Sequence, residues 1–375
     1  MHVPVKIGIV GLRFGGSWIQ RNYNKIEHYL TIKAVCDYNP ERLIRFTTNF
    51  PFDGYSSLKE MLMSADIEAV ALFTPPEGRA ELVRLCAAAG KHILSTKPFE
   101  LSSTAAFEVL EEVRSSGIVV HLNSPAPELS QDLKQLDVWR REYKLGNPVA
   151  ADWETYIKYD EKADGTWQDS NTACPVAPIF RIGIYGINEL ISMLGNVSSV
   201  QVASSRLFTG RPTPDNAKIL LEFENGAIGS VFASFCIDDG QCFPGFMRIH
   251  YEHGTVCKRQ INGGDPNNRA KFDAVELTLQ CKINGVSQHE CVRILPENRS
   301  GEYQLENFVQ AIRTGNSAPG VDTAEAVANG IAVIEAMTKS AAENKKVQVK
   351  SLIRENPTYI EGRQNFHQYF LTNNT

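Results

Sequence analysis

Short apolar runs alternate with helix-like segments over the first third of the chain. The helix-like segments include residues 79–89, closed by Gly90, and 103–115, closed by Gly117. The apolar runs cover residues 5–10, 30–36, 67–73, 92–95 and 118–122. Strands separated by helices of this length imply right-handed crossovers between parallel strands. We therefore expect an α/β domain with a parallel sheet over residues 1–123.

The pattern changes after residue 123, where longer alternating runs follow one another. Asn225-Gly226 and Asn284-Gly285 are hairpin turn signals between two such pairs of runs. The runs cover residues 149–158, 198–208, 217–223, 227–236, 246–252, 273–283 and 288–294, and helical segments cover about 128–143, 177–194, 303–313 and 323–343. We expect an α+β domain over residues 124–375 with a large, mostly antiparallel, open-faced sheet.

Hydrophobic residues alternate onto both faces of this sheet, as in Ala217 to Phe235. The face away from the helices then needs cover, so we expect a homo-oligomer, a dimer or larger, formed sheet to sheet.

Composition narrows the class of protein. The 375 residues, 43% of them hydrophobic, suit two domains with a core each. A net charge of −5 with scattered basic residues argues against nucleic acid as a partner. No apolar run reaches the length of a membrane span, and the chain starts without the features of a signal peptide. The eight cysteines and eight histidines do not cluster in ligand spacing. We expect a cytoplasmic protein with no membrane partner and no metal.

The first apolar run ends in a glycine-rich turn, Gly11-Leu12-Arg13-Phe14-Gly15-Gly16, that leads into a helix. This resembles a dinucleotide fingerprint, in which Gly11 permits the tight turn, Gly16 the packing of helix on strand, and the helix N-terminus attracts the pyrophosphate. Arg13 replaces the middle glycine, so either the pyrophosphate lies further off or the guanidinium adds a contact. A plain glycine-rich turn is the alternative.

Asp37 ends the second apolar run, 26 residues after Gly11. A carboxylate there accepts hydrogen bonds from the adenosine ribose and repels a 2′-phosphate. The alternative is a turn or capping residue. Together the two features favour NAD over NADP in a Rossmann domain.

Two further segments resemble the glucose-fructose oxidoreductase / inositol dehydrogenase / MocA family of oxidoreductases. They are Phe73-Thr74-Pro75-Pro76 and the run from Ala89 to Phe99, where the family pattern reads roughly TPP…GKHVLxEKP. The resemblance extends over essentially the whole chain. It implies NAD as cofactor and the following cofactor-binding residues: Gly11, Arg13, Phe14, Gly15, Gly16, Asp37, Tyr38, Thr74, Pro75, Pro76 and Lys97.

The resemblance also implies two catalytic residues. The family's EKP lysine, which lies beside the nicotinamide and the reacting hydroxyl, maps to Lys97, although Thr96 replaces the glutamate. The family's D-x-G-x-H segment, often with tyrosine last, maps to residues 181–185, so Tyr185 inherits the acid/base role. A phenol with a pKa near 10 needs a neighbouring cation to act at neutral pH, and Lys97 or Arg181 is expected to supply it.

The substrate side departs from the family at Arg181, where an aspartate normally holds substrate hydroxyls. Arg181 either binds a substrate anion, donates to a sugar oxygen, or pairs with Glu189 or Asp152. Helical spacing places Arg181, Tyr185 and Asn188 on one face. Aromatic residues near the start of the second domain are expected to stack on a sugar, with core or interface packing as the alternative. The expected substrate-binding residues are Asn123, Trp153, Tyr156, Trp167, Arg181 and Asn188.

These features predict an NAD-dependent dehydrogenase that oxidises a secondary hydroxyl of a sugar, glycoside or cyclitol. Residues 1–123 would bind NAD, and residues 124–375 would serve substrate binding and oligomerisation. One alternative is a glycosidase or lyase that oxidises transiently and regenerates its NAD in place. The other is a non-catalytic dinucleotide-binding regulator on the same fold.

Overall fold

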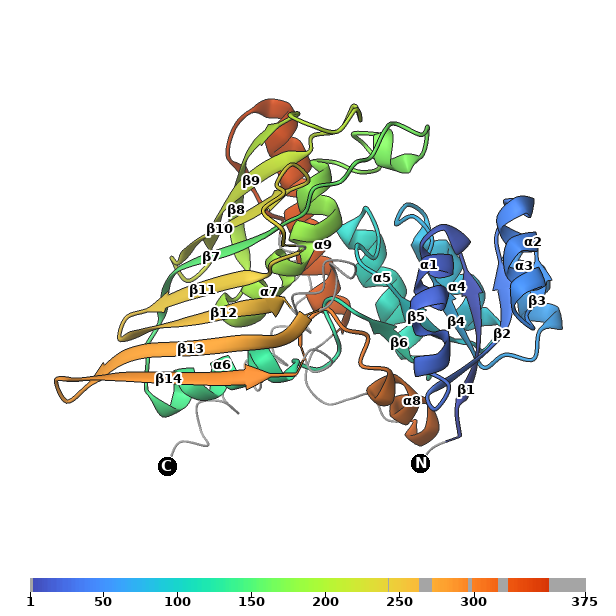
Figure 1. The fold of residues 1–375 in the computed structure, drawn as a ribbon, viewed down its shortest axis with the longest axis horizontal. Coiled ribbons are helices and arrows are strands. Elements are labelled where there is room, and N and C mark those ends of the chain that lie inside the picture. Colours follow the sequence, from blue (N-terminus) through green and yellow to red (C-terminus); the bar gives the residue numbers. More distant parts are fainter. Residues whose placement is uncertain (1–2, 242, 263–271, 296–298, 316–322, 351–375) are drawn as a thin grey trace.

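The computed structural model describes residues 3–350 apart from 242, 263–271, 296–298 and 316–322. Two β-sheets lie on opposite sides of the molecule, with helices packed between them (Figure 1). No helix among the described residues is long and apolar enough to cross a membrane.

The first sheet has six parallel strands in the order β3-β2-β1-β4-β5-β6, which confirms the predicted α/β class. Its strands are β1 (Val5–Val10), β2 (Leu30–Cys36), β3 (Asp53–Tyr55), β4 (Ala69–Leu72), β5 (His92–Ser95) and β6 (Val120–Leu122). Its helices are α1 (Leu12–Asn22), α2 (Pro40–Asn49), α3 (Leu58–Ser64), α4 (Arg79–Ala88) and α5 (Ser103–Arg114), with a short 3₁₀ turn at Tyr23–Lys25. Helices cover both faces, which is why β4 is a continuous apolar run and β1 is buried except at Lys6. The short β3 and α3 were not predicted.

The second sheet has nine strands in the order β14-β13-β12-β11-β7-β10-β9-β8-β15. Its strands are β7 (Pro148–Tyr156), β8 (Val197–Ser205), β9 (Asn216–Phe223), β10 (Ile228–Ser234), β11 (Phe246–Tyr251), β12 (Gly254–Asn262), β13 (Phe272–Ile283), β14 (Val286–Ile294) and β15 (Val347–Gln348). All neighbours are antiparallel except β7 and β10, so the predicted mostly antiparallel sheet is confirmed. The sequence analysis missed β12 because a lysine, Lys258, occupies an inward position that normally carries an apolar residue.

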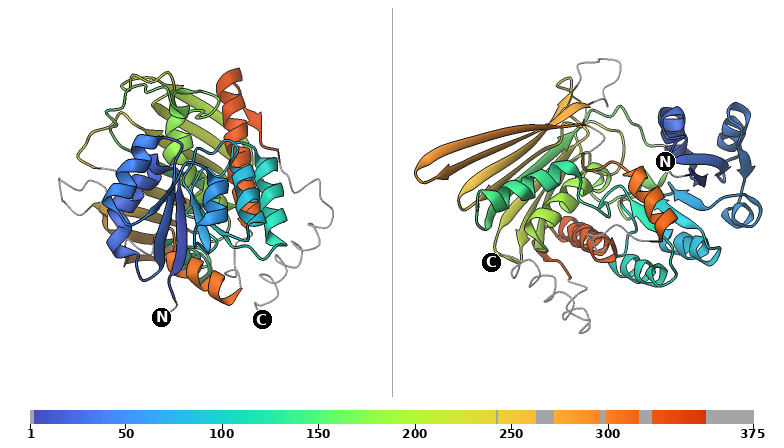
Figure 2. Two further views of the ribbon diagram at one scale, coloured as in Figure 1. Left: turned by 90° about the vertical axis from the view of Figure 1, so that its right-hand side faces the viewer. Right: turned by 90° about the horizontal axis from the view of Figure 1, so that it is seen from below.

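Helices cover one face of the second sheet, and the right-hand view of Figure 2 shows them on the side that faces the first sheet. They are α6 (Gln131–Glu142), α7 (Ile184–Leu194) with a π-helical turn before it (Ile179–Gly183), and α9 (Thr323–Glu343), while η2 (Trp167–Asp169) is a 3₁₀ turn. Gly186 lets α7 approach β7, because a Cβ there would lie 2.2 Å from the Trp153 ring. The helix α8 (Leu305–Thr314) returns to the first sheet, where Phe308 and Val309 join its core. The chain beyond residue 123 therefore also completes the Rossmann layer.

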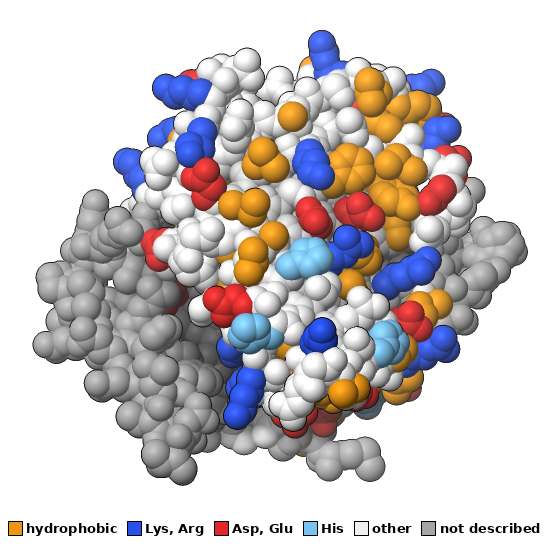
Figure 3. Space-filling view, turned by 90° about the vertical axis from the view of Figure 1, so that its left-hand side faces the viewer, with side chains coloured by type: hydrophobic (Ala, Val, Ile, Leu, Met, Phe, Trp, Pro, Cys, Tyr) orange, Lys and Arg blue, Asp and Glu red, His pale blue; other side chains and the backbone are white. Residues whose placement is uncertain are grey.

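The other face of the second sheet is open, and Figure 3 shows hydrophobic and charged side chains interspersed across it. On β9 the outward residues are Lys218, Leu220 and Glu222, while the residues between them are buried. The predicted hydrophobic alternation on both faces is therefore wrong for this strand. Leu220 and Ile228 are nevertheless 56% and 59% exposed on this face.

Candidate active site

The glycine-rich turn joins β1 to α1 at the carboxyl edge of the first sheet. Gly11 has φ of +89°, and a Cβ there would lie 2.7 Å from the Phe73 carbonyl oxygen, so only glycine fits. Gly15 lies against Ile9 of β1, whereas a Cβ on Gly16 would meet the Phe46 ring of α2 at 2.5 Å. The role expected for Gly16, packing of helix on strand, therefore belongs to Gly15.

Asp37 lies beside this turn, as predicted from its place at the end of β2. Its carboxylate accepts hydrogen bonds from the backbone N–H of Leu12 (2.7 Å) and of Asn39 (2.8 Å). The Arg42 guanidinium contacts both of its oxygens, at 3.2 and 2.9 Å. Asn39, not Asp37, caps α2. Tyr38 next to it is 87% exposed, with Arg42 over its ring.

The loop after β4 completes the dinucleotide edge. The Thr74 hydroxyl oxygen is buried and has no hydrogen-bond partner, although buried hydroxyls normally have one. Phe14 is 43% exposed and packs edge-on against Phe73 with ring centroids 5.3 Å apart. Pro75 is exposed and Pro76 is buried. A partnerless hydroxyl beside a glycine turn and a carboxylate fits a bound dinucleotide.

Lys97 and Tyr185 come together from the two halves of the chain. Lys97 follows β5, and the Arg79 guanidinium holds this segment by donating to the carbonyls of Thr96 (2.6 Å) and Pro98 (2.5 Å). The Lys97 amine donates to the Arg181 carbonyl and lies 4.6 Å from the centroid of the Tyr185 ring. That carbonyl belongs to the π-helical turn, whose i→i+5 pattern departs from that of an α-helix.

The electrostatics of this pair differ from the expectation. Burial lowers the pKa of Lys97 to about 7, and the nearby charges of Arg181 and Arg79 add to the lowering. Burial raises the pKa of the Tyr185 hydroxyl, even though a hydrogen bond from Asn123 opposes the rise. The expectation that Lys97 or Arg181 lowers the tyrosine pKa is therefore wrong. The physical reason is that burial of the hydroxyl is the largest effect, while the Lys97 amine lies over the ring face.

Asn123 joins these groups at the end of β6. Its side-chain amide donates to the Tyr185 hydroxyl (2.9 Å) and to the Gly301 carbonyl (3.2 Å). Its side-chain oxygen accepts from the Lys97 backbone N–H (3.3 Å). Asn123 thereby fixes the Tyr185 hydroxyl relative to Lys97.

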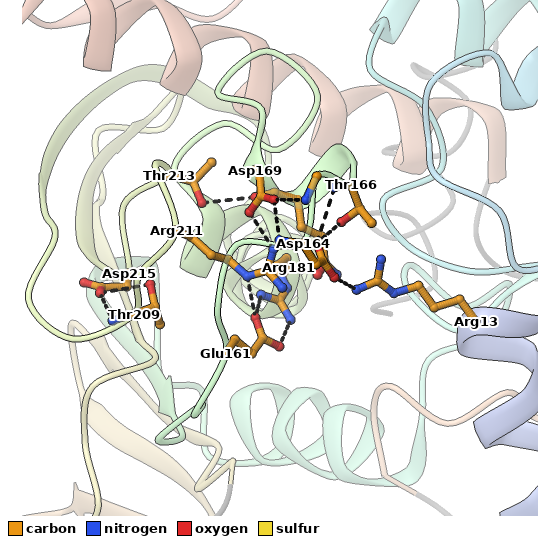
Figure 4. A network of polar contacts seen from close by, with 12 residues as sticks. Arg13, Glu161, Asp164, Thr166, Asp169, Arg181, Thr209, Arg211, Thr213 and Asp215 are labelled. Atoms are coloured by element: carbon orange, nitrogen blue, oxygen red, sulfur yellow. Dashed lines mark hydrogen bonds and ion pairs between the residues drawn. The ribbon is translucent and has the colours of Figure 1, made fainter.

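The second-domain wall of the site is a network of arginines and carboxylates (Figure 4). Arg181 binds both oxygens of Glu161, each at 2.8 Å, and its guanidinium lies over the rings of Tyr159 and Phe235. The expected partners of Arg181 were wrong, because Glu189 pairs with Lys258 and Asp152 accepts a hydrogen bond from Ser230. The carboxylate of Glu161 lies close to Arg181 because the loop after β7 folds back over the π-helical turn.

Arg211 anchors the same loop. Its guanidinium binds Glu161 (3.1 Å), Asp164 (3.1 Å) and Asp169 (2.6 Å), and the residue is 6% exposed. Asp164 also forms an ion pair with Arg13, which reaches across from α1 (Figure 4). Arg13 therefore has a protein carboxylate as its partner in this structure.

Three residues expected at the substrate lie elsewhere. Trp153 is 4% exposed in the hydrophobic core, where its indole N–H donates to Glu189 (3.0 Å). Tyr156 points to the open face of the sheet, in line with the exposed Asp152 and Glu154 of β7, and donates to Asp239. Strand alternation places it opposite Trp153.

Asn188 is the third of these residues. It is 8% exposed, donates to the Ser124 hydroxyl (3.0 Å) and packs against Gly330 of α9. It lies one turn further along α7 than Tyr185, at the contact between helices. By contrast, Trp167 is half-buried beside this network, edge-on to Phe180 at 6.2 Å.

The sequence analysis missed Glu161, Asp164, Asp169, Arg211 and Arg79. The sequence did hold one usable signal. Four acidic residues fall between positions 160 and 169, shortly before the helix with Arg181, for which the sequence analysis found no certain partner. Arg211 lies in a segment rich in glycine and proline, which is typical of an exposed loop, yet its side chain is buried. Among the residues that the structure describes, no group of three or more His, Cys, Asp or Glu side chains could hold a metal ion.

Comparison with known proteins places this geometry in a family. Residues 5–124 match the family described as "Oxidoreductase family, NAD-binding Rossmann fold", and residues 141–349 match its "C-terminal alpha/beta domain".

Individual relatives are distant. Galactose 1-dehydrogenase of Pseudomonas fluorescens is 26% identical over 70% of this chain and 79% of its own length. Levoglucosan dehydrogenase of Pseudarthrobacter phenanthrenivorans is 22% identical over 54% of this chain, and the match spans only 58% of that protein. A structure of levoglucosan dehydrogenase with NADH and levoglucosan superposes with a TM-score of 0.72 at 18% identity, covering 92% of this chain and 99% of that one.

The two family-domain matches, over residues 5–124 and 141–349, together cover the glycine turn, Asp37, Lys97 and the helix that carries Tyr185. They confirm the resemblance and NAD as the cofactor. The chain belongs to the Gfo/Idh/MocA family of NAD-binding oxidoreductases.

Proposed function

We propose that this protein oxidises a secondary hydroxyl of a sugar, glycoside or cyclitol to a ketone. The observation that carries the proposal is the convergence of Lys97 and Tyr185, whose amine and ring centroid lie 4.6 Å apart. Burial lowers the pKa of Lys97 to about 7, which suits the amine to accept a proton at neutral pH. The dehydrogenases of galactose and levoglucosan among the relatives support a sugar as substrate.

The residues divide the chemistry between them. The Lys97 amine takes the hydroxyl proton while the carbon–hydrogen bond breaks and the carbonyl forms. Bound NAD supplies the hydride acceptor. Asn123 holds the Tyr185 hydroxyl so that it can donate to the substrate oxygen. This assigns proton abstraction to Lys97 and a positioning role to Tyr185, because the pKa of the phenol is raised.

The residues that would hold NAD are those at the carboxyl edge of the first sheet. The turn at Gly11 would admit the pyrophosphate, Asp37 would accept from the ribose in place of a hydrogen bond from Arg42, and the Thr74 hydroxyl would gain a partner. Since Asp37 repels a 2′-phosphate, NAD should be preferred to NADP.

A panel of free sugars, glycosides and cyclitols tests the proposal, with NAD and NADP in parallel. We expect NADH absorbance to rise and the product mass to fall by two hydrogens. Product without net NADH would point instead to transient oxidation with NAD regenerated in place. Binding of NAD without turnover of any panel member would contradict the proposal and favour a regulator.

We also propose that the open face of the second sheet is covered by a second copy of the chain. The exposed Leu220 and Ile228 on this face support it. Light scattering should give a dimer or larger at micromolar concentration, and Leu220→Glu should weaken it. A monomer under these conditions would contradict the proposal.

A further inference from the structure

One carboxylate on the second-domain wall is held between two arginines. Glu161 receives a hydrogen bond from Arg181 on each oxygen and one from Arg211 on Oε2. A carboxylate offers about four lone-pair positions. Three are occupied here, which leaves one acceptor position on Oε1. The side chain remains 23% exposed.

This carboxylate belongs to the same site as Lys97. The Arg181 carbonyl accepts a hydrogen bond from the Lys97 amine, while the Arg181 guanidinium forms an ion pair with Glu161. The buried Cys174 thiol lies within electrostatic range of Lys97, Arg181, Arg211 and Glu161 alike. Arg181 thus contacts both the proton acceptor and the carboxylate.

The charges of the network cancel. Three arginines face three carboxylates: Arg13, Arg181 and Arg211 against Glu161, Asp164 and Asp169. Hydrogen bonds from Arg181 and Arg211 lower the pKa of Glu161, against the effect of its burial, so the carboxylate stays ionised at neutral pH. An anionic substrate would have to displace a protein carboxylate from its arginine, whereas a neutral hydroxyl needs only the free lone pair.

We infer that Glu161 accepts a hydrogen bond from a substrate hydroxyl, and that the substrate is an uncharged polyhydroxylated ring and not a sugar acid or sugar phosphate. The inference rests on the proposed function and narrows its substrate class. Arg181 and Arg211 act as positioning residues that hold the acceptor.

The first test uses the unmodified protein with NAD and matched pairs of rings, galactose with galacturonate and glucose with glucuronate. We expect kcat/KM for the neutral member to exceed that for the acid by about tenfold or more. A preference for the acids would overturn the inference and leave the proposed oxidation intact. Turnover of neither class in the full sugar panel would overturn the proposed function itself.

The second test replaces the acceptor. Glu161→Gln keeps the shape but frees Arg181 and Arg211, so KM for the neutral ring should rise about 10- to 100-fold with kcat changed much less. The preference between galactose and galacturonate should shift toward the acid, because two arginines lose their partner. A purely structural role would not produce that shift.

Glu112→Gln is the matched control, since it makes the same chemical change at an exposed carboxylate of α5 that pairs with Arg84 and with no residue of the site. It should leave KM for the neutral ring within about twofold. If Glu161→Gln fails to fold by circular dichroism, Glu161→Asp replaces it and should raise KM while keeping the neutral preference. An unchanged KM in either Glu161 variant would overturn the inference.

Discussion

Two lysines whose amines are desolvated on folding have pKa values that shift in opposite directions. Lys97, at the candidate active site, has its pKa lowered to about 7. Lys258, on β12 and 1% exposed, has its pKa raised. The difference lies in the partners: the Lys97 amine meets a carbonyl and an aromatic ring, whereas the Lys258 amine meets Glu189 and, at 3.4 Å, Asp132.

The comparison shows that burial alone does not decide what a lysine does. Burial opposes the charged form at both positions, but the two carboxylates around Lys258 outweigh it. Arg181 and Arg79 instead reinforce it at Lys97. The arrangement around Lys258 gives a permanent cation that links α6, α7 and β12. The arrangement around Lys97 gives an amine that exchanges protons at neutral pH.

Removal of Lys97 should have the largest effect. Lys97→Met should lower kcat by about 10³-fold, because it removes the proton acceptor, while NAD affinity measured by fluorescence titration stays within a few fold. The exposed Lys33 of β2 offers a control, and Lys33→Met should retain full activity. Near-normal turnover in Lys97→Met would place the base elsewhere.

Removal of Lys258 should act on stability. Lys258→Met leaves Glu189 and Asp132 as buried carboxylates without their cation, which should lower the free energy of unfolding by about 3–5 kcal/mol. Urea denaturation followed by circular dichroism measures it. The double variant Lys258→Met/Glu189→Gln should recover part of the loss, since one uncompensated charge is removed. A loss below about 1 kcal/mol would mean that the cluster is solvated and not buried.

The pKa of Lys97 also sets a pH dependence of stability. In the unfolded chain this lysine keeps its ordinary pKa of 10.5, so the unfolded state binds more protons between about pH 7 and 10.5. Below pH 7 the folded protein therefore carries the full free-energy cost of burying the charged Lys97 amine. It loses this cost as the pH rises. The melting temperature of Lys97→Met minus that of the parent should be highest below pH 7 and should fall as the pH rises above 7. A difference that does not change with pH would contradict the lowered pKa.

Tyr185 should have the smallest effect. If its hydroxyl only positions the substrate oxygen, Tyr185→Phe should reduce kcat about tenfold, the value of one hydrogen bond. The pH at which activity rises should stay near 7, because the Lys97 amine contacts the ring, which the variant keeps. Tyr156→Phe on the open face of the second sheet is the matched control, since it removes a hydroxyl that donates to Asp239. A loss as large as that of Lys97→Met would return the acid/base role to Tyr185.

Much of the fold could be predicted because its determinants are local. The apolar strands of the first sheet are continuous since helices cover both of their faces, and Gly11 and Asp37 follow directly from strand ends. Residues 5–124 also carry the family's motifs, so Lys97 could be found by resemblance.

What could not be predicted depends on contacts between distant residues. The strand β12 was missed because the carboxylates that accommodate Lys258 lie on α6 and α7. Glu161 was missed because only the folded loop after β7 brings it onto Arg181, twenty positions along the chain. The raised pKa of Tyr185 likewise follows from the burial of its hydroxyl between the two halves of the chain, which spacing does not encode.

The loop that carries Glu161 also carries Asp164, and this has a consequence for the order of events in a catalytic cycle. Asp164 ties the loop to Arg13 at the cofactor turn, and Arg211 ties Asp164 to Glu161. If the loop lifts to release the reduced dinucleotide, it removes the acceptor for the sugar in the same movement. We expect an ordered mechanism in which the cofactor binds first and leaves last, which product-inhibition kinetics with NADH and the keto sugar can establish.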